Sequence, residues 1–279
     1  MKNLLISPIL KWVGGKRQLL SEIMPLINKN CSTYIEPFVG GGAVFFELQP
    51  KKAIINDYNE ELINVYRVVK DSPEELISEL KVYEEKNNED FFYEVRSLDR
   101  TPEYADMSAT KKAARVIYLN KTCYNGLYRV NAAGQFNSPY GRYKKPNIVN
   151  ATTIKAMSKY FNSNNIVIKQ GDYRDALKGI RKGAFVYLDP PYMPISTSSS
   201  FTGYTENGFS YEQQVELKKE CDKLKEKGVS FLQSNSDCIE IRNLYKDYEI
   251  LTVKAKRSIN SNALKRGEIN EVLIYYVSE

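Results

Sequence analysis

Short apolar runs alternate with amphipathic segments over much of the chain. Runs too short for a helix predict strands that begin at residue 34 and that span residues 53–57, 165–170, 184–188, 229–233, 249–253 and 271–277. Helical spacing predicts helices at residues 43–48, 211–227 and 237–245, and an amphipathic helical run at residues 18–27. This alternation predicts an α/β fold with a sheet of about seven strands.

The pattern changes between residues 60 and 150. Helical periodicity runs through residues 62–80, and the span 71–106 holds twelve acidic residues against four basic ones, so we expect this span to face away from any nucleic acid such as DNA that the protein binds. Residues 111–145 then hold eight basic residues, no acid, and several aromatic and amide side chains. Together these supply phosphate contacts, stacking surfaces and readers of base edges. The alternative for such a charge run is a solvated face.

The composition narrows the possible chemistry. The chain of 279 residues has a net charge of +6 and no histidine, which excludes a Ser-His-Asp triad, a Cys-His dyad and a histidine-ligated metal. Its four cysteines are scattered, so neither a zinc knuckle nor a disulfide framework is indicated, and we expect no metal. No apolar run approaches the roughly 20 residues of a membrane span, and residues 1–11 lack the layout of a signal peptide. We therefore expect a cytoplasmic protein with no membrane partner.

The strand at residues 184–188 ends abruptly in Asp189, two prolines and Tyr192. Prolines forbid further strand pairing, and open α/β sheets bind ligands at the carboxyl ends of such strands. Asp189 and the Pro190 carbonyl could accept hydrogen bonds from the amino group of an adenine, and Tyr192 could stack on that base. The alternative is that Asp189 caps a turn in an unrelated α/β protein.

Residues 11–17 form a second candidate site, because two glycines lead to Lys16 at a helix start. A Walker A loop is excluded, since Leu10 and Arg17 stand where that loop requires glycine and Ser or Thr. Lys16 beside a helix N-terminus could still bind a carboxylate, such as the methionine end of S-adenosylmethionine. For Trp12, the only tryptophan in the sequence, core packing is the commoner role.

A strand, a glycine-rich turn and a helix follow at residues 34–48. Glycines in such a turn let the backbone come close to a ligand. About 20 residues after the turn, the strand at residues 53–57 ends in Asp57, where dinucleotide-like sites have the carboxylate that receives ribose hydroxyls. The alternative is that Asp57 caps the helix that begins near Asn59.

Two further segments are predicted to be loops near the site. Residues 195–204 carry five serines and threonines before Phe201 and no apolar periodicity, which predicts a mobile loop beside the active site. Residues 254–266 hold five basic residues and no acid, which indicates either a loop that contacts the DNA backbone or a hydrated hairpin.

Taken together, the motifs resemble one family. They are Lys-Trp-x-Gly-Gly-Lys at residues 11–16, Glu-Pro-Phe-x-Gly-x-Gly at 36–42, Tyr-Asn-Gly-Leu-x-Arg at 124–129, Asn-x-Pro-Tyr-Gly-Arg-Tyr at 137–143, Gly-Asp-Tyr at 171–173 and Asp-Pro-Pro-Tyr at 189–192. With these motifs in this order, and with Asp57, the chain resembles the Dam-type DNA adenine-N6 methyltransferases and their restriction-modification relatives of the DpnII kind. The resemblance runs from about residue 9 to residue 276. One departure is Tyr173, where phenylalanine is common.

The resemblance implies a Rossmann-like methyltransferase core at residues 1–59 and 151–279, with a helical target-recognition domain inserted at residues 60–150. It implies S-adenosylmethionine as the methyl donor, double-stranded DNA as the partner and GATC as the target. No obligate protein partner is implied.

The resemblance also assigns individual residues. The cofactor is expected to lie among Trp12, Lys16, Phe38, Gly40, Gly42, Asp57, Asp172, Tyr173 and Asp189, with Asp57 on the ribose and Tyr173 against the adenine. The residues expected to read GATC are Lys11, Leu127, Arg129, Pro139 and Tyr143. Tyr124 and Asn125 would fill the space left by the extruded base, and Arg142 would contact a phosphate.

The expected reaction is extrusion of the adenine followed by direct in-line methyl transfer, with Asp189, Pro190 and Tyr192 as the catalytic residues. Cytosine-C5 enzymes need a Pro-Cys dipeptide, which this chain lacks, and cytosine-N4 enzymes usually have serine in place of Asp189. Two other classes remain open: a methyltransferase for RNA or protein, which the GATC-reading residues disfavour, and a DNA-binding module without turnover, which the intact site disfavours.

Overall fold

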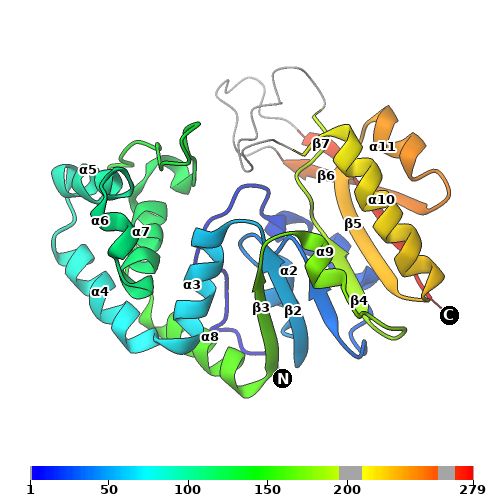
Figure 1. The fold of residues 1–279 in the computed structure, drawn as a ribbon, viewed down its shortest axis with the longest axis horizontal. Coiled ribbons are helices and arrows are strands. Elements are labelled where there is room, and N and C mark those ends of the chain that lie inside the picture. The colour runs from blue at the N-terminus through cyan, green and yellow to red at the C-terminus, as the bar shows by residue number, and fades with distance from the viewer. Residues whose placement is uncertain (1, 195–208, 257–267, 279) are drawn as a thin grey trace.

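The computed structural model describes residues 2–194, 209–256 and 268–278. Strands in these ranges form one seven-stranded sheet in the order β3-β2-β1-β4-β5-β7-β6 (Figure 1). The strands are β1 (Tyr34–Glu36), β2 (Lys52–Asp57), β3 (Asn165–Gln170), β4 (Phe185–Leu188), β5 (Ser230–Ser236), β6 (Glu249–Lys256) and β7 (Glu268–Tyr276). The predicted α/β fold with about seven strands is confirmed.

The direction of the strands brings the motifs to one edge of the sheet. β3, β2, β1, β4 and β5 are mutually parallel, whereas β7 runs antiparallel between β5 and β6. All four residues of β4 are buried, as expected for an apolar strand in the middle of a covered parallel sheet. The carboxyl ends of β1, β2 and β4 therefore meet, and each is followed by one of the candidate motifs.

Helices cover both faces of the sheet. Side chains alternate between two hydrophobic clusters, so that Tyr34 of β1 lies in the first and Ile35 in the second. The helices on the side of the second cluster are α9 (Tyr173–Leu177), α10 (Tyr211–Glu226) and α11 (Ile239–Leu244). The first cluster packs against α2 (Ala43–Leu48), α3 (Glu60–Asp71) and α8 (Ala151–Ser163).

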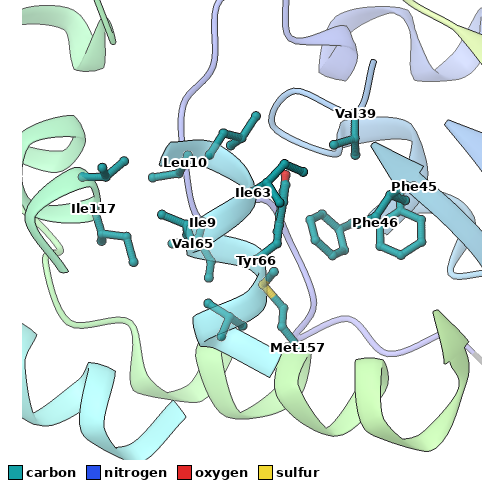
Figure 2. Close-up of a cluster of buried hydrophobic side chains, with 14 of the residues drawn as sticks. Ile9, Leu10, Val39, Phe45, Phe46, Ile63, Val65, Tyr66, Ile117 and Met157 are labelled. Atoms are coloured by element: carbon teal, nitrogen blue, oxygen red, sulfur yellow. The ribbon is translucent and has the colours of Figure 1, made fainter. Parts of the chain in front are cut away.

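The first cluster continues from the sheet into α4 (Pro73–Glu85), α5 (Glu89–Ser97), η3 (Leu98–Arg100) and α7 (Ala109–Thr122). The same part of the chain also forms the short helices α6 (Glu103–Asp106) and η4 (Tyr124–Gly126). Figure 2 shows α3 between the two parts, with Tyr66 on the side of Phe46 and with Ile117 of α7 on its other side. One hydrophobic core therefore joins the sheet to the helices on its β3 side.

The segment after α7 folds back on itself and is tied to α5, η3 and α7. Isolated bridges pair Cys123 with Tyr140 and Val130 with Phe136. Asp99 accepts a hydrogen bond from the Phe136 N–H at 2.7 Å and forms an ion pair with Arg115 of α7, also at 2.7 Å. These contacts fix the hairpin at residues 129–137 on the helical part.

One predicted element is wrong. The amphipathic run at residues 18–27 is not a continuous helix but three short pieces, η1 (Lys16–Leu19), α1 (Leu20–Ile23) and η2 (Met24–Leu26). Pro25 within η2 has no N–H to donate to a preceding turn, which prevents a regular α-helix there. The predictions for residues 195–204 and for 257–266 lie outside the described residues.

Candidate active site and DNA-facing surface

Asp189 follows β4 directly and forms an ion pair with Lys16, whose Nζ lies 2.9 Å from Asp189 Oδ1. Lys16 begins η1, is buried, and also donates a hydrogen bond to the Gly14 carbonyl at 2.7 Å. The same Nζ lies 4.6 Å from the centroid of the Tyr192 ring. The fold thus brings together the predicted catalytic residues Asp189 and Tyr192 and the predicted cofactor residue Lys16.

Carboxyl groups from four strands share this corner. Glu36 ends β1, Asp57 ends β2, Asp189 follows β4, and Glu271 lies on β7. Burial raises the pKa of Asp189 to about 6; the ammonium of Lys16 opposes this rise, and the charges of Glu271 and Asp57 add to it. Such a concentration of carboxyl groups makes the site favourable for a cationic ligand.

Sequence reasoning assigned no role to Glu36 or Glu271. Glu36 is 2% exposed and accepts a hydrogen bond from the Tyr34 hydroxyl at 2.6 Å, and burial raises its pKa well above the usual range. Glu271 is 8% exposed and accepts a hydrogen bond from the Tyr192 hydroxyl at 2.7 Å. An acid within or beside a buried apolar strand is the sequence signal that could have identified both.

Asp57 supports the glycine-rich turn. Its Oδ2 accepts a hydrogen bond from the Gly40 N–H at 2.9 Å, and its Oδ1 accepts one from the Asn59 N–H at 3.0 Å. Asn59 itself caps α3 by accepting a hydrogen bond from the Leu62 N–H. Capping of α3 is therefore the role of Asn59. Burial raises the pKa of Asp57.

The turn requires glycine at two positions because of close neighbours. Gly40 and Gly42 have φ angles of 47° and 71°, in the left-handed region. A Cβ on Gly40 would lie 3.1 Å from the Trp12 ring, and one on Gly42 would lie 2.7 Å from the Phe46 ring. Trp12 also stacks on Tyr128 with ring centroids 4.8 Å apart. It therefore lies between the turn and the segment that follows α7.

The predicted cofactor residues Phe38, Asp172 and Tyr173 are adjacent. Phe38 stacks on Tyr173 with ring centroids 5.1 Å apart. Asp172 caps α9 by accepting a hydrogen bond from the Arg174 N–H, and its carboxylate forms an ion pair with the Arg174 guanidinium at 2.7 Å. The arginine lowers the pKa of Asp172. This carboxyl therefore stays ionised, next to a two-ring aromatic surface.

Buried amides hold the Asp-Pro-Pro-Tyr segment. Gln214 Nε2 donates a hydrogen bond to the Pro191 carbonyl at 3.0 Å, and Asn235 Oδ1 accepts one from the Met193 N–H at 3.1 Å. Within the ranges the structure describes, no hydrogen bond occupies the Pro190 carbonyl. The two amides thus hold the backbone on both sides of Tyr192.

Asn120 of α7 fixes Lys11 beside the predicted recognition segment. Its Oδ1 accepts a hydrogen bond from the Lys11 N–H at 2.9 Å, and its Nδ2 donates to the carbonyls of Lys11 and Gly126. A Cβ on Gly126 would lie 2.9 Å from the Lys11 side chain, and the half-buried Leu127 follows directly. Two residues expected to read bases, Lys11 and Leu127, are therefore neighbours.

The segment after α7 carries exposed aromatic rings on a constrained backbone. Tyr124 and Tyr143 are exposed, and the Tyr124 N–H donates to the Pro139 carbonyl at 2.8 Å. Asn125 and Arg142 have φ angles of 59° and 54°, a conformation that is uncommon for residues other than glycine and that often marks functional sites. The backbone therefore holds these side chains at the surface.

The two arginines of this segment have different partners. Arg129 donates from Nε to Asn137 Oδ1 at 2.6 Å, across the hairpin. Arg142 forms an exposed ion pair with Glu89 of α5 at 2.8 Å. The acidic span that we expected to face away from DNA thus reaches the basic segment at this point. An exposed pair of this kind is worth only about 0.2–1 kcal/mol, so it would open readily for a phosphate.

Comparison with known proteins identifies the family. Residues 12–259 match the D12 class of N6 adenine-specific DNA methyltransferases. The chain belongs to this family. It is 46% identical to the Type II methyltransferase M1.LlaDCHI of Lactococcus lactis subsp. cremoris, a match that covers 96% of this chain and 95% of that one. It is 42% identical to the Type II methyltransferase M.MjaIII of Methanocaldococcus jannaschii, covering 96% of this chain and 98% of that one, and 34% identical to the DNA adenine methylase of Escherichia coli (strain K12), covering 96% and 94%.

The methyltransferase is therefore adenine-specific, acts on DNA and uses S-adenosylmethionine as its donor. Among the helices that the structure describes, none is long and apolar enough to cross a membrane. In the same ranges, no group of three or more acidic, cysteine or histidine side chains is arranged to hold a metal ion.

Proposed function

We propose that this methyltransferase modifies the adenine of double-stranded GATC after extruding that base from the duplex. The observation that carries the proposal is the corner at the end of β4, where Lys16 pairs with Asp189 and lies over the Tyr192 ring. The Asp189 side chain is only 19% exposed. A base that is still stacked in the duplex cannot bring its amino group to it, so the target has to leave the helix, which costs a few kcal/mol. Stacking on Tyr192 offsets part of that cost.

The residues around this corner fit the cofactor. S-Adenosylmethionine, when bound, supplies a methyl group on an electrophilic sulfonium. The surrounding carboxyl groups favour that cation, and the Phe38 and Tyr173 pair offers a surface for its adenine. Asp57 receives the ribose hydroxyls, and Lys16 binds the methionine carboxylate. The other residues that we assign to this site are Trp12, Gly40, Gly42 and Asp172.

The roles of the catalytic residues follow from how they are held. Asp189 and the Pro190 carbonyl accept hydrogen bonds from the two N–H groups of N6. These bonds draw the nitrogen toward tetrahedral geometry, which makes its lone pair nucleophilic. The ion pair with Lys16 orients Asp189, and Gln214 anchors the next peptide. Tyr192 holds the plane of the base. Transfer is then direct and in line, without a covalent enzyme intermediate, and the proton leaves N6 toward Asp189.

DNA recognition is assigned to the segment after α7 together with Lys11. The residues that read GATC are Lys11, Leu127, Arg129, Pro139 and Tyr143. Tyr124 and Asn125 fill the gap left by the extruded base, which suits an exposed ring on a constrained backbone. Arg142 leaves Glu89 to bind a phosphate. Residues 60–150 form the recognition domain, and residues 1–59 with 151–279 form the catalytic domain.

Methyl transfer to plasmid, followed by sequencing that reports the modified base and its context, tests this function. We expect N6-methyladenine in GATC, and methylation confined to another sequence would contradict the assignment of the reading residues. Asp189→Ala should abolish transfer but leave duplex binding largely intact, because the phosphate contacts lie elsewhere. Loss of DNA binding in proportion to activity would contradict the catalytic role of Asp189.

A further inference from the structure

A hydrogen bond joins the aromatic ring of the catalytic motif to a distant strand. The Tyr192 hydroxyl donates to Glu271 Oε2 at 2.7 Å, although the two residues are 79 positions apart in the chain. Glu271 lies on β7, where it pairs with Ser236 of β5 on one side and with Val253 of β6 on the other. A strand paired on both sides is a rigid support for a side chain that orients another.

Glu271 is a buried acid next to apolar residues on its strand. The residues that follow it on β7, Val272, Leu273 and Ile274, are fully buried and apolar, whereas Glu271 is a carboxyl that is 8% exposed. Burying a carboxyl costs free energy unless it is hydrogen-bonded. A leucine or valine would fit an apolar strand at lower cost. The acid at this position therefore has a role that packing does not supply.

The contact fixes the ring plane that a base would stack on. A tyrosine ring turns about two side-chain torsions, and a hydrogen bond at its hydroxyl removes the freedom of the far end. The Lys16 ammonium lies over the same ring, 4.6 Å from its centroid. Stacking depends on the orientation of the ring, so holding the ring before the base arrives lowers the entropy cost of the productive geometry.

We propose that Glu271 is a positioning residue for methyl transfer: its carboxylate holds the Tyr192 ring in the plane that receives the extruded adenine. This inference rests on the proposed function, in which Tyr192 stacks on the target base. Glu271 acts through the Tyr192 hydroxyl and touches neither substrate nor cofactor. Its effect on the orientation of the ring therefore disappears when that hydroxyl is absent.

The experiment is a double-mutant cycle on single-turnover methylation of a GATC duplex. Glu271→Met removes the acceptor at similar side-chain length, Glu271→Gln keeps an acceptor oxygen, and Tyr192→Phe keeps the ring but removes the hydroxyl. Because a hydrogen bond to a charged group is at stake, we expect Glu271→Met and Tyr192→Phe each to slow transfer roughly ten- to hundredfold. The double variant should be no slower than Tyr192→Phe, and Glu271→Gln should recover most of the rate.

Two further measurements separate positioning from stability and from the proposed function. Glu268→Gln, on the same strand and exposed, is the matched control and should keep the full rate. A duplex with 2-aminopurine at the target position reports extrusion by its fluorescence. Glu271→Met should weaken that change, whereas Glu271→Gln, which also lacks the charge but keeps an acceptor oxygen, should not.

The outcomes distinguish the two proposals. A further loss of rate when Glu271→Met is added to Tyr192→Phe, or an unchanged rate in Glu271→Met alone, would overturn the positioning role. Full activity in Tyr192→Ala, or no fluorescence change with the wild-type protein, would instead contradict stacking of an extruded base, on which the inference rests.

Discussion

Asp189 can take the proton that leaves N6 only while its carboxyl is ionised. Burial raises its pKa to about 6. Because the pKa is raised, the protonated carboxylic acid accumulates as the pH falls through that value. We therefore expect kcat/KM, which reports the free enzyme, to fall about tenfold for each pH unit below about 6. Initial rates over a pH series with subsaturating DNA would measure this.

Lys16→Met provides a second test of this pH dependence. The Lys16 ammonium lowers the pKa of Asp189, so its removal should move the acid limb of the profile to higher pH. An acid limb that stayed in place in the variant, or a wild-type limb near the ordinary pKa of an aspartate, would show that another group controls the rate.

Asp57 is expected to bind the cofactor, but it also accepts the Gly40 N–H. Asp57→Asn keeps an oxygen for that N–H and removes the charge. We expect it to weaken S-adenosylmethionine binding by about 1–3 kcal/mol through weaker hydrogen bonds to the ribose, and to lower Tm because the Asn59 N–H loses its acceptor. Calorimetric titration measures the affinity. An unchanged dissociation constant would argue against a role on the ribose.

The role of a residue could be predicted from the sequence where a reactive side chain comes at the end of a recognisable strand. Asp189 and Asp57 each follow an apolar run that reads as a strand, so their place at the sheet edge could be inferred. Glu36 and Glu271 could have been noticed as acids in or beside apolar strands, but their roles could not be assigned, because these depend on contacts between strands. Their partners Tyr34 and Tyr192 are defined only once the strands are paired.

Among the elements, the hairpin at residues 129–137 is expected to read bases, and the turn after it to hold the backbone. Arg129 is oriented by Asn137 across the hairpin, as a base-reading guanidinium needs to be. A bidentate arginine discriminates for guanine by about 1–3 kcal/mol. Arg129→Ala should therefore reduce the preference for GATC over sites altered at one base. Competition binding with single-mismatch duplexes measures that preference.

Arg142→Ala should behave differently, because Arg142 is assigned to a phosphate. We expect it to weaken binding to GATC and to mismatched sites by similar factors and to reduce the salt slope of log K by about 1. Titrations at several salt concentrations measure that slope. If Arg142→Ala altered site preference while Arg129→Ala weakened all sites alike, the two assignments would be reversed.

Elements were predictable where one local rule dominated. The strand at residues 165–170 and the helix at residues 43–48 have the predicted bounds, since short apolar runs beside turn residues define them. β7 begins at Glu268 and not at the predicted residue 271, because pairing with β6 extends the ladder through polar positions. Periodicity reports burial, whereas strand ends depend on hydrogen bonds to neighbours.

At the scale of the whole molecule, residues 11–16 connect the two predicted sites. Lys11, assigned to DNA, is held by Asn120 of α7, and Lys16, assigned to the cofactor, is held by Asp189. Trp12 lies between them, stacked on Tyr128 and in contact with the glycine turn. The sequence revealed this stretch as a motif. It could not reveal the contacts with Asn120, Tyr128 and Asp189, which span more than 100 residues of chain.

This connection predicts that cofactor and DNA bind cooperatively. A ligand that orders residues 11–16 from one end reduces the ordering cost at the other end, so the two affinities should rise together. Linkage requires the same factor in both directions, and coupling of about 1–3 kcal/mol corresponds to roughly 5- to 150-fold. S-Adenosylhomocysteine should tighten GATC duplex binding by this factor, and the duplex should tighten S-adenosylhomocysteine binding equally.

Asn120→Ala, which releases Lys11 but touches neither proposed ligand, should reduce the coupling. The affinity of this variant for S-adenosylhomocysteine in the absence of DNA should be unchanged. Equal duplex affinity with and without S-adenosylhomocysteine in the wild-type protein would mean that the two sites act independently despite the shared segment.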